Sequence, residues 1–92
     1  MSTMILNVIS AEYRGGFTIF LSFNNGESFL VDLKETLFND HRKIFEPLRN
    51  QEYFRNFHIR LNTIVWENEA DFAPEFLLQQ GKMMARRHSL NA

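Results

Sequence analysis

Apolar and polar residues alternate through the first third of the chain, which is typical of β-strands with one buried face. Residues 4–13 are apolar and β-branched enough for a first strand, and residues 14–16 (Arg-Gly-Gly) favour a tight turn. A second alternating run covers residues 17–23. The pair Asn25-Gly26 then predicts a type I′ hairpin turn, because both residues accept positive φ angles. With residues 27–33 as the third strand, the segment is predicted to be an antiparallel meander.

From Lys34 the apolar spacing changes to that of short helical turns. Pro47 is expected to interrupt these turns, because its ring disfavours helix in the residue before it. Asp40 fits the N-cap of a helical turn, and Asn50 fits the cap of a turn over residues 51–56. The middle of the chain is therefore predicted to form short helices.

The last third returns to alternation and then to helix. Residues 57–61 and 63–66 are predicted to be a fourth and a fifth strand. Pro74 suits the first turn of a helix, and Gly81 is expected to end it. The fold class is thus α+β: an antiparallel sheet of about four or five strands, short helices packed on one side and a C-terminal helix. We expect one domain over residues 1–81, followed by a basic tail over residues 82–92 that is a frayed helix or disordered.

Composition supports a single folded domain and limits its chemistry. Hydrophobic residues make up 45% of the 92 residues, ten of them Phe, so a core is available. A surplus of Phe would instead form the face of a homodimer. The chain has no cysteine, which excludes disulfides and thiolate metal sites. A net charge of −1 argues against a protein that coats nucleic acid. With no signal-like N-terminus and no membrane span, we expect a cytoplasmic location.

The sequence offers no constellation typical of catalysis. The histidines do not stand at metal-ligand spacing, and no serine has the context of an activated nucleophile. Acids gather at Glu67, Glu69, Asp71 and Glu75, but the glycine of a calcium loop is missing. We therefore expect no catalytic residue, no cofactor and no metal site, and hence no enzyme.

Two segments are candidates for an interaction surface: Trp66, Glu67 and Asp71 in one, and Lys82, Arg86 and Arg87 in the other. Trp66 is interpreted as a core residue, with an exposed interface anchor as the alternative. The segment after Gly81 is either a solubilising end or a helix with a basic stripe and an adaptable methionine surface.

Several motifs together resemble a known family. The chain contains Phe45-Glu46-Pro47-Leu48, then Trp66-Glu67-Asn68, and then Ala70-Asp71 followed by Pro74-Glu75. This order, over about residues 4–78, resembles the bacterial "domain of unknown function 2442" family. The resemblance implies a small α+β fold with an antiparallel sheet and no established activity, so no catalytic residue is carried over. Glu69 departs from the pattern, because the family usually has glycine there.

The resemblance also bears on function. Some members look like one half of two-gene toxin–antitoxin modules, and others are joined to helix-turn-helix domains. The leading hypothesis is a non-catalytic protein-interaction module, antitoxin-like, whose partner is a toxin encoded nearby. The alternative is a nucleic-acid-binding or autoregulatory protein that acts through the basic tail. A small enzyme or ligand binder at the acidic turn ranks last.

Overall fold

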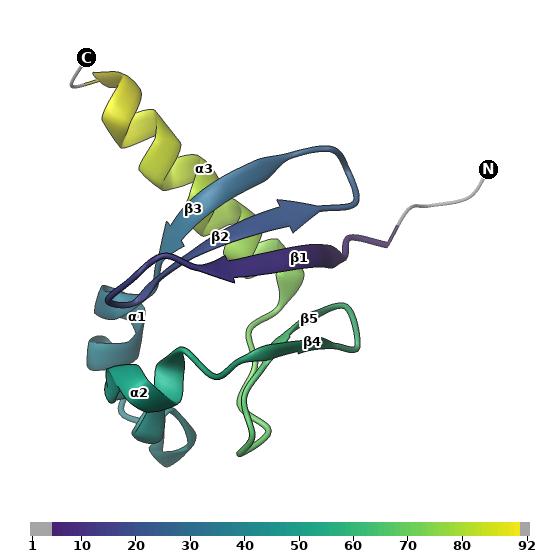
Figure 1. The fold of residues 1–92 in the computed structure, drawn as a ribbon. Coiled ribbons are helices and arrows are strands. Elements are labelled where there is room, and N and C mark those ends of the chain that lie inside the picture. The colour runs from purple at the N-terminus through teal and green to yellow at the C-terminus, as the bar shows by residue number, and fades with distance from the viewer. Residues whose placement is uncertain (1–4, 91–92) are drawn as a thin grey trace.

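The computed structural model describes residues 5–90, with side chains described as far as Arg87. It confirms the α+β class (Figure 1). The strands are β1 (Val8–Tyr13), β2 (Thr18–Phe23), β3 (Ser28–Asp32), β4 (His58–Arg60) and β5 (Thr63–Val65). The helices are α1 (Lys34–Asn39), the 3-10 turns η1 (Lys43–Phe45) and η2 (Pro47–Arg49), α2 (Gln51–Phe54) and α3 (Pro74–Leu90).

The first three strands form the predicted antiparallel meander, in the order β1-β2-β3. Strand β1 begins at Val8, so the predicted start was too early, and Met4 itself lies outside the described residues. The β2–β3 hairpin also differs from the prediction in its turn. Gly26 has a φ of 90°, whereas Asn25 does not have a positive φ. The Gly26 N–H donates to the carbonyl of Phe23 at 3.1 Å. The loop is therefore a type I turn followed by a left-handed glycine rather than a type I′ turn.

Strands β4 and β5 form a second, separate two-stranded sheet, which corrects the prediction of a single sheet. The two sheets meet where the Val8 N–H donates to the Asn62 carbonyl at 2.8 Å. The turn between β4 and β5 has positive φ at both Leu61 (51°) and Asn62 (78°). This is the geometry of a type I′ turn, and a leucine there carries steric strain that glycine or asparagine avoids. A break at Asn62 was predicted, but Leu61 was assigned to the strand because leucine rarely occupies such a turn.

Leu61→Asn is expected to stabilise the protein by about 1 kcal/mol, because asparagine tolerates the left-handed conformation that strains leucine. The side chain of Leu61 is 82% exposed, so its removal creates no cavity. Urea unfolding followed by circular dichroism measures the difference. Leu61→Ala is the matched control, because alanine removes the same apolar surface but keeps the strain. Equal stability of the two variants would contradict the assignment of strain to this turn.

The short helices and the turns between them cover one end of the core. Asn50 caps α2 as predicted: its Oδ1 accepts from the N–H of Glu52 at 2.9 Å and of Tyr53 at 3.2 Å. Pro47 does interrupt the helical turns, and it stands at the first position of η2. Asp40 was predicted as an N-cap, but it is the residue that follows the last turn of α1.

Helix α3 spans the sheet on its core side (Figure 1). It begins at Pro74, as predicted, but it does not end at Gly81. Gly81 is buried inside the helix, where a Cβ would stand 2.5 Å from the Cβ of Phe29 on β3. The glycine therefore permits a close approach of helix and strand. Residues 82–90 of the predicted tail belong to α3, and residues 91–92 lie outside the described part.

Candidate functional site

Strand β3 is an edge of the three-stranded sheet, and α3 lies across it. The second half of the helix projects beyond this edge, away from the rest of the molecule (Figure 1). Helix and strand come closest at Gly81 and Phe29. The part of α3 that extends beyond the sheet does not pack against the rest of the domain. Hollows can therefore form on both sides of the point where α3 crosses β3.

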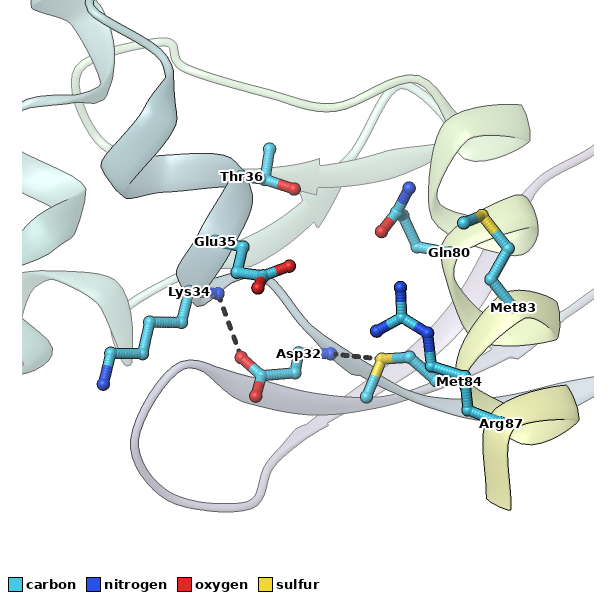
Figure 2. A pocket seen from close by; sticks show the side chains of 8 residues that line it. All are labelled: Asp32, Lys34, Glu35, Thr36, Gln80, Met83, Met84 and Arg87. Carbon is cyan, nitrogen blue, oxygen red and sulfur yellow. Dashed lines mark hydrogen bonds between the residues drawn. The ribbon is translucent and has the colours of Figure 1, made fainter. Parts of the chain in front are cut away.

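One contact joins the helix to the strand edge. The N–H of Asp32 donates to the Met84 Sδ at 3.1 Å, and the carboxylate of Asp32 accepts from the N–H of Lys34 at 2.9 Å (Figure 2). A thioether sulfur is a weak hydrogen-bond acceptor, so Met84 forms only a weak hydrogen bond with the Asp32 N–H at the edge of β3. Two hollows, one on each side, share Asp32 and Met84 among their walls.

The first hollow, which we call the apolar groove, has a volume of about 470 Å³. Its walls come from the outward face of the sheet (Thr18, Phe20, Ser28, Leu30 and Asp32), from Phe29 on the opposite face, and from α3 (Gly81, Met84 and Ala85). Phe20 and Leu30 are directly paired across β2 and β3, and Leu30 is 47% exposed. This volume lies within the range of about 300–1,000 Å³ typical of ligand sites.

The second hollow, which we call the polar cleft, has a volume of about 350 Å³ between α1 and α3. Glu35 and Thr36 point into it from α1, opposite Gln80 and Arg87 from α3 (Figure 2). No histidine lines this cleft, so a nucleophile with an adjacent imidazole base is not assembled there. The arrangement is suited to hydrogen bonding with a polar group.

The basic residues on the outer half of α3 do not line the apolar groove, and Arg87 lines the polar cleft instead. Lys82 pairs with Glu27 at 3.7 Å, which ties the helix to the start of β3. Arg86 and Arg87 are exposed, and neither forms an ion pair with any residue in the described part of the chain. A partner with carboxylates would therefore find guanidinium groups free to bind it.

A third hollow, of about 320 Å³, lies beside the start of α3 and contains two acids, Asp40 and Asp71. Arg42 also lines it, and its guanidinium donates to the carboxylate of Asp40 at 2.7 Å. That contact, with the backbone N–H of Arg42, lowers the pKa of Asp40 from 3.8 to about 2. Arg42 also packs over the ring of Phe45, at 4.8 Å from its centroid. The Asp40 carboxylate is thus already bound by Arg42 of the same chain.

Titration of the Asp40 carboxyl carbon by NMR is expected to give a midpoint near 2, below the ordinary value of 3.8. Because folding lowers this pKa, the pair stabilises the fold above pH 3.8 and loses its effect as the pH falls through about 2. Arg42→Ala should raise the pKa only part of the way, since the backbone N–H still donates. His41→Gln should raise it less. An unchanged midpoint in Arg42→Ala would contradict this cause.

The structure separates the two predicted interaction segments. Trp66 is fully buried, so it belongs to the core and is removed from the candidate surface. Glu67 and Asp71 are exposed in the segment that follows β5. Strand β5 lies at the opposite end of the molecule from the outer half of α3 (Figure 1). Lys82, Arg86 and Arg87 are exposed on that half of the helix.

The chain was compared with models of known protein families. Residues 8–82 match the model described as "Protein of unknown function (DUF2442)". The chain belongs to the DUF2442 family. Comparison with curated proteins finds no match, and comparison with solved structures finds none either. The DUF2442 match ends at Lys82, so it includes β3 and Gly81 but not Met84, Ala85 or the two arginines that follow.

One departure from the DUF2442 pattern has a structural explanation. Glu69 stands where the family usually has glycine, and its φ is 71°. Its carboxylate pairs with Arg60 on β4, across the turn that leads out of β5. The turn therefore keeps the left-handed conformation that glycine adopts freely, and the ion pair lies exposed on the surface beside it.

The residues that build the hollows were not recognised in the sequence as neighbours, above all Leu30 and Gly81. A signal was present for the helix, because Leu77, Gly81 and Met84 are spaced by four and three residues, which is one helical face. Within residues 5–90, no group of His, Cys, Asp or Glu is arranged to hold a metal ion. No helix in that range is long and apolar enough to cross a membrane.

Proposed function

We propose that this DUF2442 chain is a protein-interaction module without catalytic activity, acting in the cytoplasm as an antitoxin-like partner of a small protein. The observation that supports this function is the combination of the apolar groove with exposed, unpaired arginines on the same projecting helix. Protein interfaces combine an apolar centre with a polar rim in which arginine is enriched. None of the three hollows contains a histidine beside a nucleophile, which would support an enzyme instead.

Affinity capture from the native cell tests this function. The tagged chain is expected to retain one protein in stoichiometric amount, and the product of the neighbouring gene is the first candidate. Charge reversal by Arg86→Glu with Arg87→Glu should weaken the capture, whereas Glu67→Lys at the far end of the molecule should not. Absence of any stoichiometric protein in repeated captures would contradict the proposed function.

Nucleic-acid binding is the second candidate, and the exposed helical position of Lys82, Arg86 and Arg87 is the observation that favours it. Phosphate contacts by these side chains would make binding strongly dependent on salt. Gel mobility of DNA at low salt tests this function, with the same double charge reversal as the variant. Truncation after Gly81 is unsuitable, because it would also remove Met84 from its contact with β3. An unshifted mobility for the intact protein would eliminate this candidate.

A further inference from the structure

The loop between β2 and β3 places a side-chain amide next to an unhindered main-chain nitrogen. Asn25 and Gly26 are both exposed in this loop. Attack of the Gly26 nitrogen on the Asn25 Cγ would close a five-membered ring. Glycine has no Cβ, so nothing on its own Cα shields the nitrogen from the side chain before it. The pair therefore supplies the two groups that asparagine deamidation requires, in a position that water reaches.

Asn25 differs in this respect from every other asparagine of the chain, because only Asn25 is followed by glycine. Asn24 stands one residue earlier in the same loop, but the nitrogen that would attack it belongs to Asn25 and is hindered by a Cβ. Asn62 is exposed in the turn after β4, and the β-branched Thr63 follows it. The chain thus offers one favoured position and, in Asn24, a comparison within the same loop.

Three hydrogen bonds hold the loop away from the geometry of attack. The Asn25 Oδ1 accepts from the Glu27 N–H at 3.0 Å, and the Asn25 Nδ2 donates to the Glu27 Oε1 at 2.7 Å. The Gly26 N–H donates to the Phe23 carbonyl at 3.1 Å. The first two bonds fix the side-chain amide against Glu27, and the third retains the proton that the attacking nitrogen must lose. A local opening of the loop must therefore precede the reaction.

We propose that Asn25 is a site of spontaneous deamidation whose rate is restrained by Glu27, a property that goes beyond the proposed function. The Gly26 nitrogen gives its proton to a solvent base and bonds to the Asn25 Cγ. The bond from Cγ to Nδ2 breaks, and Nδ2 leaves as ammonia with a proton from water. Water then opens the cyclic imide at either of its two carbonyls. Opening at the new bond gives aspartate, and opening at the former peptide bond gives isoaspartate, so one water replaces one ammonia overall.

The change alters both the hairpin and its contact with α3. Either product carries a carboxylate in place of the Asn25 amide, so the hydrogen bond to the Glu27 carboxylate is replaced by repulsion between like charges. The Glu27 Oε1 also lies 3.7 Å from the Lys82 Nζ, so the new charge arises beside the basic half of α3. Isoaspartate in addition lengthens the main chain between β2 and β3 by one carbon, whereas the loop sets the register of a hairpin. The isoaspartate form is therefore expected to be the least stable of the three.

Incubation of the intact folded protein at mildly alkaline pH, followed by digestion and mass spectrometry, tests the site. Position 25 is expected to convert about tenfold or more faster than Asn24, and to yield aspartate and isoaspartate together. Labelling by an isoaspartyl methyltransferase identifies the second product. Conversion of Asn24 as fast as Asn25, or aspartate alone at position 25, would overturn the proposal, because the first removes the role of Gly26 and the second removes the cyclic imide.

The restraint by Glu27 is tested by comparing folded and denatured protein. The wild type is expected to deamidate at Asn25 about tenfold more slowly when folded than in concentrated urea, because three hydrogen bonds must open first. Equal rates would overturn the restraint without any variant being needed.

A pair of variants assigns the restraint to Glu27. Glu27→Ala, which removes the acceptor of the Asn25 Nδ2, should raise the folded-state rate about two- to threefold while leaving the rate in urea almost unchanged. Glu12→Ala is the matched control, because the Glu12 carboxylate pairs with Arg14, next to the other hairpin turn, and it should leave both rates unchanged. Equal folded-state rates in the two variants would contradict the role of Glu27.

Discussion

Trp66→Ala is expected to lower the free energy of unfolding by about 3–5 kcal/mol, the largest loss for any single truncation considered for this protein. The Trp66 side chain is fully buried, and its ring contacts the rings of Phe54, Phe57 and Phe72 at centroid distances of 5.5, 6.2 and 5.9 Å. Its Nε1–H donates to the Phe54 carbonyl at 2.7 Å. Truncation would leave a cavity and an unsatisfied buried carbonyl.

Urea unfolding followed by circular dichroism measures this loss, and thermal unfolding should show a drop of at least about 12 °C. Trp66→Phe is the intermediate case, because it keeps one six-membered ring but removes the donor and the volume of the five-membered ring; its cost should be about 1–3 kcal/mol. Phe38→Ala is the control, since Phe38 is 46% exposed and packs beside Phe17. Equal losses for Trp66→Ala and Phe38→Ala would contradict the placement of Trp66 in the core.

Gly81→Ala is expected to destabilise the protein by about 1–3 kcal/mol, opposite to the usual effect of this exchange inside a helix. Alanine is intrinsically favoured over glycine in a helix by about 1 kcal/mol. At this position, however, the new Cβ would stand 2.5 Å from the Cβ and 2.7 Å from the Cγ of Phe29. These atoms lie at the root of the Phe29 side chain, so relief requires a shift of the strand or the helix.

The control for Gly81→Ala is Ala85→Gly, one turn later and exposed on the same helix. That exchange should cost only about 0.5–1 kcal/mol, through helix propensity alone. Chemical denaturation gives both values. A gain in stability for Gly81→Ala would contradict the close approach of α3 to β3.

Local signals in the sequence predicted most of the fold, and they failed where tertiary contacts decide. Alternation identified the three strands of the meander, and Asn50 identified the start of α2, because both patterns depend on near neighbours. The type I′ turn at Leu61 and Asn62 was not predictable, since a leucine there is held by the surrounding sheet. Gly81 was misinterpreted for the same reason. A glycine that permits packing and a glycine that ends a helix have the same local sequence, and only Phe29, far away in the chain, distinguishes them.

The candidate site was predicted in part. Lys82, Arg86 and Arg87 were proposed from their charge, and they are exposed on α3, while their role in binding stays a prediction. The apolar groove could not be predicted, because it needs the outward face of β2 and β3 beside the second half of α3. Each of those surfaces is unremarkable alone, and their juxtaposition depends on where the helix crosses the sheet.

Helix α3 continues past Gly81 and forms the apolar groove with β3. NMR of the free protein tests it most directly, through nuclear Overhauser effects between the α protons of Gly81 and the ring of Phe29, and between the Met84 methyl group and the Asp32 amide. Both effects are expected, together with helical carbon shifts from Pro74 through Arg87. Random-coil shifts from Lys82 onward, with neither effect present, would contradict it.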